Sequence, residues 1–98
     1  MTNTVLTAIA WYSAEDWPTI KARATDSEKL HDSYADWLAS AMEIERTLRK
    51  DGRKVVRVSI APDALTLWCS FRGVENNGEA RTQYAAEIAR KQASKASR

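Results

Sequence analysis

Residues 51–63 read DGRKVVRVSIAPD, and this stretch decides how the chain is built. Gly52 is the residue type that commonly ends a helix, because it adopts the left-handed conformation without strain. Hydrophobic side chains then recur at every second position of the segment Lys54–Ile60, which predicts a strand. Pro62 and Asp63 are both favoured in the first turn of a helix. The stretch therefore predicts a strand enclosed between two helices.

The segment before Gly52 predicts a long helix over residues 33–50, about 25 Å long at 1.5 Å per residue. Apolar residues recur along it at intervals of three and four and predict one buried stripe, made of Tyr34, Trp37, Leu38, Ala41, Ile44 and Leu48. Asp32 and Ser33 are both candidate N-caps. Glu45 and Arg49 have the spacing of an ion pair, which we expect on the solvent-facing side of the helix.

Three further elements complete the pattern. Residues 5–12 are rich in β-branched and aromatic side chains and predict a first strand, followed by a short helix that buries Ile20. A helix from Pro62 to the stop at Gly73 buries Leu65, Trp68 and Cys69, and a last helix runs from about Glu79 to Gln92. The tail, residues 93–98, is basic and is expected to fray.

The order of elements is β-α-(α)-β-α-α, which predicts a helix-rich α/β fold in a single domain over residues 1–92. The long helical connection favours a parallel strand pair, and an antiparallel pair stays open. Two strands alone make a poor sheet. We therefore expect either helices on both faces of the sheet or a second copy of the chain that completes it as a homodimer.

Composition limits the classes of function. The chain has 98 residues, one cysteine and a formal net charge of +2. A lone thiol forms no intrachain disulfide, and the sequence contains neither a signal peptide pattern nor a membrane-spanning run, so we expect a cytoplasmic protein. Residues 1–45 carry eight acidic and three basic side chains, and residues 46–98 carry twelve basic and five acidic ones. This asymmetry favours attraction between the two halves, within one chain or across a dimer; the alternative is an anionic partner.

Four segments carry a resemblance to known proteins. IAWY at 9–12, YxxWL at 34–38, VVRV at 55–58 and PxxLxxWC at 62–69 resemble a family of short, mostly uncharacterised bacterial proteins, some of them carried on plasmids or other mobile elements. The resemblance spans about residues 9–89. It implies a bacterial accessory protein and supplies no activity and no site residues.

The side chains that could carry chemistry are few and scattered. His31 is the only histidine and has no cluster of metal ligands beside it in the sequence. Cys69 lies late in its predicted helix, where the helix dipole stabilises a thiolate least, and next to Trp68. The three glycines are isolated, so no phosphate-binding loop is present. We therefore expect no enzyme, no metal and no cofactor, with a thiol-dependent enzyme as a remote alternative.

The remaining candidates are contact residues. Tryptophan, tyrosine and arginine concentrate binding energy at protein interfaces. The candidates for a protein interface are Trp17, expected to be partly exposed beside Pro18, together with Tyr34, Arg46 and Arg49. The leading hypothesis is therefore a small non-enzymatic protein that binds another protein or itself, with an inhibitor or regulator of a host or defence machine as one form. The alternative is a nucleic-acid-binding accessory protein that contacts phosphates through Arg49, Lys50, Arg53, Lys54, Arg57, Arg90 and Lys91.

Overall fold

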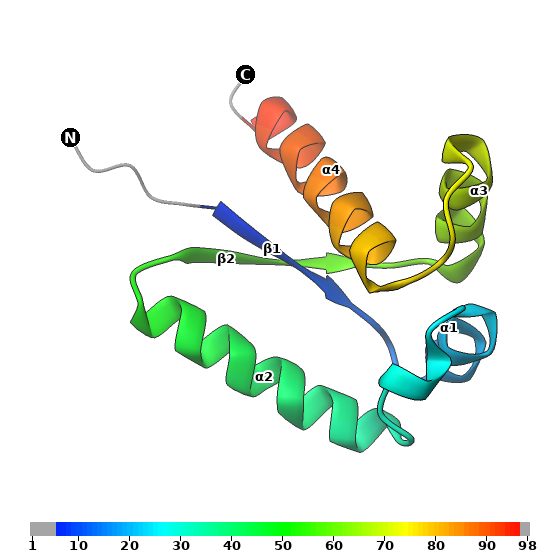
Figure 1. Ribbon diagram of the computed structural model, residues 1–98. Coiled ribbons are helices and arrows are strands. Elements are labelled where there is room, and N and C mark those ends of the chain that lie inside the picture. Colours follow the sequence, from blue (N-terminus) through cyan, green and yellow to red (C-terminus); the bar gives the residue numbers. More distant parts are fainter. Residues whose placement is uncertain (1–5, 97–98) are drawn as a thin grey trace.

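The computed structural model describes residues 6–96, with the side chains of residues 6–92. The observed order of elements is β-α-α-β-α-α, which confirms the predicted helix-rich α/β class (Figure 1). The elements are β1 (Leu6–Trp11), α1 (Trp17–Arg23), the 3-10 turn η1 (Ser27–Lys29), α2 (Tyr34–Lys50), β2 (Lys54–Ser59), α3 (Pro62–Arg72) and α4 (Gly78–Ala96). Helix α4 continues to Ala96, past the expected end at Gln92, so the backbone of residues 93–96 is helical. Val5 and residues 97–98 lie outside the described residues.

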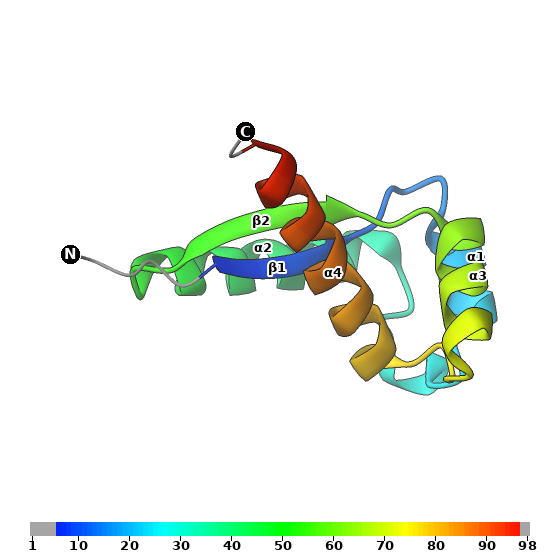
Figure 2. The ribbon, with the colours of Figure 1, turned by 90° about the horizontal axis from the view of Figure 1, so that it is seen from above.

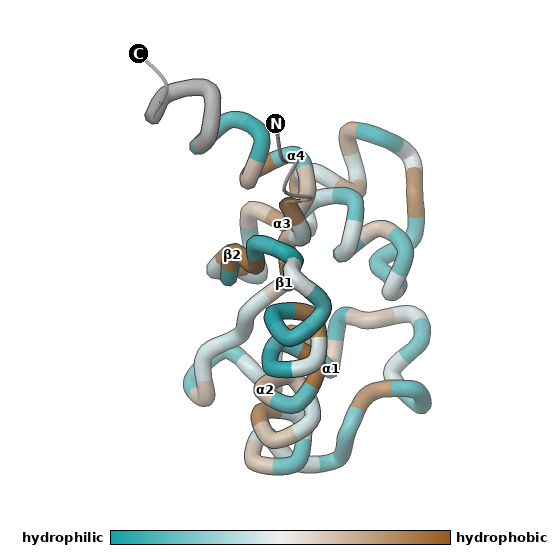
Figure 3. Tube along the Cα trace, turned by 90° about the vertical axis from the view of Figure 1, so that its left-hand side faces the viewer, coloured by the Kyte–Doolittle hydropathy of each residue, from teal (hydrophilic) through white to brown (hydrophobic). Residues whose placement is uncertain are grey.

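The two strands form a parallel pair, as the long helical connection favours. Their register places Leu6 opposite Lys54 and Trp11 opposite Ser59. Helices α2 and α4 lie on opposite faces of the strands, which Figure 2 shows from above and Figure 3 from the side. Among the described residues the sheet has only these two strands, so each strand has one edge without a neighbouring strand.

Side-chain alternation assigns the residues of each strand to one of the two helices. Trp11 packs edge-to-face on Trp37 of α2, with ring centroids 5.2 Å apart, so alternate residues of β1 starting at Thr7 face α2. The opposite face carries Ala8 and Ala10, and α4 covers it with small residues that are almost completely buried, namely Ala80, Ala85 and Ala89. Alanine on both sides lets the helix approach the strand closely, which keeps the core dense although it is small.

The predicted helix boundaries rest on local hydrogen bonds. Ser33 caps α2, since its hydroxyl accepts a hydrogen bond from the backbone N–H of Asp36 at 3.1 Å. Gly52 ends α2 with φ +84°, and Gly73 ends α3 with φ +67°. Only glycine adopts this left-handed conformation without strain. The helix ends that the sequence predicts at these two glycines are therefore confirmed.

Helix α2 is rotated relative to the predicted stripe. Ile44, expected inside, is 52% exposed, whereas Glu45, expected on the solvent side, is 9% exposed. The cause is Arg57 of β2, which donates two hydrogen bonds to the Glu45 carboxylate at 2.7 and 2.8 Å. The Arg57 guanidinium also stacks on the Trp11 ring, 3.9 Å from its centroid. Turning Glu45 toward the sheet moves Ile44 toward solvent.

Candidate protein interface

Helix α3 is apolar on two sides, and only one of them is buried. Leu65 is fully buried and Cys69 is 5% exposed, so one side packs into the core as predicted. The other side carries Leu67, which is 71% exposed, and Phe71, which is 96% exposed. Val74, just after the Gly73 stop, is 44% exposed. We call Leu67 and Phe71 the α3 stripe; their spacing of i and i+4 places them on one side of the helix, whereas Val74 lines a separate depression with Cys69 and Thr66.

The outward orientation of the stripe is fixed by contacts on the buried side of α3. Trp68 packs on Tyr84 of α4, with ring centroids 5.4 Å apart, and its indole N–H donates to Glu87 at 3.3 Å. Arg72 stacks on the Trp68 ring and also binds Glu87, at 2.8 Å. These contacts hold α3 against α4 and leave the stripe facing away from α4. In Figure 1, α3 lies at one end of the molecule, beyond the carboxyl ends of the strands.

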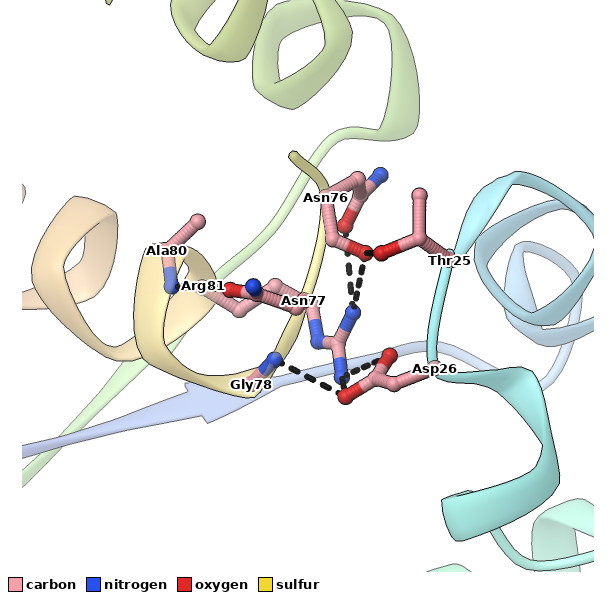
Figure 4. A network of polar contacts seen from close by, with 7 residues as sticks. All are labelled: Thr25, Asp26, Asn76, Asn77, Gly78, Ala80 and Arg81. Atoms are coloured by element: carbon pink, nitrogen blue, oxygen red, sulfur yellow. Dashed lines mark hydrogen bonds and ion pairs between the residues drawn. The ribbon is translucent and has the colours of Figure 1, made fainter. Parts of the chain in front are cut away.

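A second set of contacts anchors the loop between α3 and α4 to the segment after α1 (Figure 4). Arg81, only 4% exposed, binds both carboxylate oxygens of Asp26 at 3.0 and 3.1 Å and donates to the carbonyl of Asn76 at 3.1 Å. The backbone N–H of Gly78 donates to Asp26 at 2.9 Å. Burial alone would raise the pKa of Asp26, but the hydrogen bond and charge of Arg81, with the Gly78 N–H, lower the pKa overall. The network stabilises the ionised carboxylate and fixes the start of α4.

Basic side chains lie where α3 meets α4. Arg72, Glu87, Arg90 and Lys91 line a shallow depression of about 520 Å³ on the α3–α4 side. Because the Glu87 carboxylate is already bound to Arg72 and Trp68, the basic groups exceed the acidic ones here. The side of α3 that faces α4 therefore carries an excess of positive charge, whereas the stripe on the opposite side is apolar.

The aromatic residues predicted to form a protein interface are buried or half-buried rather than exposed. Trp17 is 4% exposed, so the expectation that it is partly exposed is wrong. It packs in a cluster of aromatic rings whose centroids lie 5.0–6.3 Å apart, formed by Trp11, Tyr12, Trp17, Tyr34 and Trp37. Tyr34 is half-buried, and its hydroxyl donates to the carbonyl of Tyr12 at 3.0 Å. The side chain of Trp17 also holds a buried N–H that has no hydrogen-bond partner among the described residues.

The predicted basic residues of α2 and β2 are partly engaged within the chain. Arg46 pairs with Glu43, and Arg49 lies 3.5 Å from Glu45 and also donates to the Val55 carbonyl at 3.3 Å. Arg57 is bound to Glu45, and Arg53 donates to the Thr7 hydroxyl at 3.3 Å. Lys50 and Lys54 are exposed. The structure therefore does not assemble the seven candidates for nucleic acid into one free cationic face: Arg90 and Lys91 lie on α4, beside α3.

Cys69 and His31 do not form a shared reactive centre. Cys69 is buried, and burial raises the pKa of its thiol, which keeps it protonated. His31 is exposed in the loop before α2 and is absent from the depression that Cys69 lines with Arg23, Thr66, Val74 and Asn76. Within residues 6–96 no group of three or more histidine, cysteine or carboxylate side chains could hold a metal ion. Over the same residues no helix is both long and apolar enough to cross a membrane.

Sequence reasoning missed the α3 stripe, although its signal is present. Leu67 and Phe71 have helical spacing, but so do Leu65 and Cys69 on the other side of the same 11-residue helix. Each set alone satisfies the pattern of a buried face. Two apolar stripes on one short helix are the signal that could have identified the surface.

Comparison with known proteins adds no assignment: no family model, no curated protein and no solved structure matches this chain.

Proposed function

We propose that this chain is a small, non-enzymatic protein-binding module that inserts the α3 stripe into an apolar groove on another protein. The observation that carries the proposal is Phe71, a large aromatic side chain that is 96% exposed on a helix whose opposite side is fully buried. Exposed aromatic side chains flanked by arginine are typical of the residues that dominate binding energy at protein interfaces.

The charges where α3 meets α4 indicate the chemistry of the partner. Arg72 of α3 lies with Arg90 and Lys91 of α4 in one depression, so a groove that encloses α3 as far as this depression carries acidic side chains along that rim. Such a partner buries the stripe and pairs with these basic side chains at the same time. An inhibitor or regulator of a host or defence machine, one form of this proposal, would act through this kind of contact.

Contacts of the basic side chains favour a protein partner over nucleic acid. Arg49 and Arg57 both lie against Glu45, and neutralisation by a carboxylate reduces the counterion release on which phosphate binding depends. In the nucleic-acid alternative, the exposed Lys50 and Lys54 contact phosphates. It predicts that any protein captured with the chain from an extract is lost after nuclease treatment.

Affinity capture from the natural host tests the proposal. We expect the wild type to retain a protein in nuclease-treated extract, and Phe71→Asp to lose it. Met42→Asp is the matched control, because Met42 is an exposed apolar side chain on α2, away from the stripe. Retention that Phe71→Asp leaves unchanged, or that requires intact nucleic acid, would overturn the proposal.

A further inference from the structure

The outer edge of β1 is a second surface of interest, because no other strand pairs with it among the described residues. The carbonyl of Trp11 accepts a hydrogen bond from the N–H of Ile60, at 3.0 Å. Backbone groups alternate between the two sides of a strand. The N–H and C=O groups of Ala8 and Ala10 therefore point away from β2, and none of them hydrogen-bonds to another described residue.

The two edges of the sheet differ in their protection. On β2, Arg49 donates to the outward carbonyl of Val55 at 3.3 Å, and the strand itself contains Lys54 and Arg57. Proteins commonly use such charges to prevent a sheet edge from pairing with another chain. Strand β1, with the sequence LTAIAW, contains no charge and no proline. Its edge therefore lacks the features that would oppose the addition of a strand.

An apolar groove of about 370 Å³ runs along this same edge. Its floor is β1, one wall is formed by Ile44 and Leu48 of α2, and the other includes Arg81 and Thr82 of α4. The ion pair between Glu45 and Arg57 turns Ile44 toward this side of the molecule. The exposed Ile44 and the open edge of β1 therefore belong to one continuous surface.

The two ends of β1 lie beside segments of opposite net charge, although some of these charges are already paired within the chain, as Asp26 is with Arg81, Asp32 with Lys21 and Arg49 with Glu45. At the carboxyl end of β1, residues 13–36 carry six acidic and three basic side chains. At its amino end, residues 46–54 carry five basic and one acidic side chain. A two-fold axis beside β1 makes the two copies antiparallel, which brings the acidic end of one copy beside the basic end of the other.

We propose that the chain forms a homodimer by antiparallel pairing of β1 with β1 of a second copy, giving a continuous four-stranded sheet. In this arrangement Ala8 lies opposite Ala10 of the partner subunit and exchanges backbone hydrogen bonds with it. Ile9 lies near the two-fold axis, and the groove beside Ile44 is filled by the second copy. The dimer leaves the α3 stripe free, so it is independent of the proposed function.

Analytical ultracentrifugation of the purified chain over a range of concentrations tests the dimer. We expect a mass twice the 11.0 kDa of one chain. Ile44→Glu places a charge in the groove and should weaken the dimer by about tenfold or more, while the far-UV circular dichroism is retained. Met42→Glu, at an exposed apolar position on α2 outside the groove (43% against 52% for Ile44), should leave the dimer unchanged.

A charge exchange between the two ends tests the antiparallel arrangement. Glu28→Lys and Lys50→Glu each create like-charge repulsion at both ends of the dimer, so each variant alone should dimerise more weakly. Mixing the two variants pairs opposite charges at both ends and should restore the dimer. A monomer at every concentration, a dimer insensitive to Ile44→Glu, or a dimer dissociated by Phe71→Asp instead would overturn the proposal, as would no recovery on mixing.

Discussion

Leu65 and Leu67 of α3 give a direct test of which side of this helix stabilises the fold. Leu65 is fully buried, whereas Leu67, two positions further on, is 71% exposed. Leu65→Ala removes three buried carbon atoms, worth about 2.4 kcal/mol at about 0.8 kcal/mol each, and leaves a cavity that adds to the cost. We expect the free energy of unfolding to fall by about 3 kcal/mol and the melting temperature by about 10–20 °C.

Leu67→Ala is the matched control, with the same chemical change on the same helix. We expect the free energy of unfolding to change by less than about 0.5 kcal/mol, because the side chain is already in water. Urea titration followed by tryptophan fluorescence measures both variants, since the buried Trp17 and Trp37 become exposed on unfolding. A loss of about 2 kcal/mol or more for Leu67→Ala would show that the stripe is packed within the protein itself, contrary to the structure.

Three other predictions follow from the polar contacts and the thiol. Glu45→Ala should destabilise the fold by about 1–2 kcal/mol, because it removes two charged hydrogen bonds, whereas alanine at the exposed Glu43 should have no measurable effect in the same urea titration. The pKa of Asp26 is lowered in the folded state, so its contribution to the free energy of unfolding is complete above the unfolded pKa of about 3.9 and is lost as the pH falls through the lower folded pKa. Asp26→Asn should therefore flatten the fall in the free energy of unfolding below about pH 4. An unchanged pH profile of stability would contradict this. Burial raises the pKa of Cys69, so a thiol reagent at pH 7 should react with the native protein much more slowly than with the urea-unfolded one, and equal rates would show that the thiol is accessible.

Most of the architecture could be predicted from the sequence because its signals are local. Ser33 specifies the start of α2, and Gly52 and Gly73 specify the ends of α2 and α3, through hydrogen bonds and backbone angles that depend on a few neighbouring residues. The parallel pairing followed from the length of the connection between the strands. These features need no knowledge of long-range contacts.

The failures involve partners far apart in the sequence. Periodicity placed Ile44 inside and Glu45 outside, but Arg57, twelve residues later, reverses this by binding the carboxylate. Trp17 was expected near the surface because it precedes a proline, yet the rings of Tyr12, just after β1, and Trp37 of α2 enclose it. Spacing along a helix identifies apolar sides and cannot tell which of two such sides meets the core.

Photo-crosslinking from position 71 in the natural host tests the central claim most directly. A photoreactive phenylalanine analogue in place of Phe71 keeps the ring in solvent, where the wild-type side chain is 96% exposed. We expect a covalent adduct with a different protein, and no such adduct when the analogue replaces Met42. Adducts at both positions alike, or adducts at position 71 with nucleic acid and no protein, would contradict it.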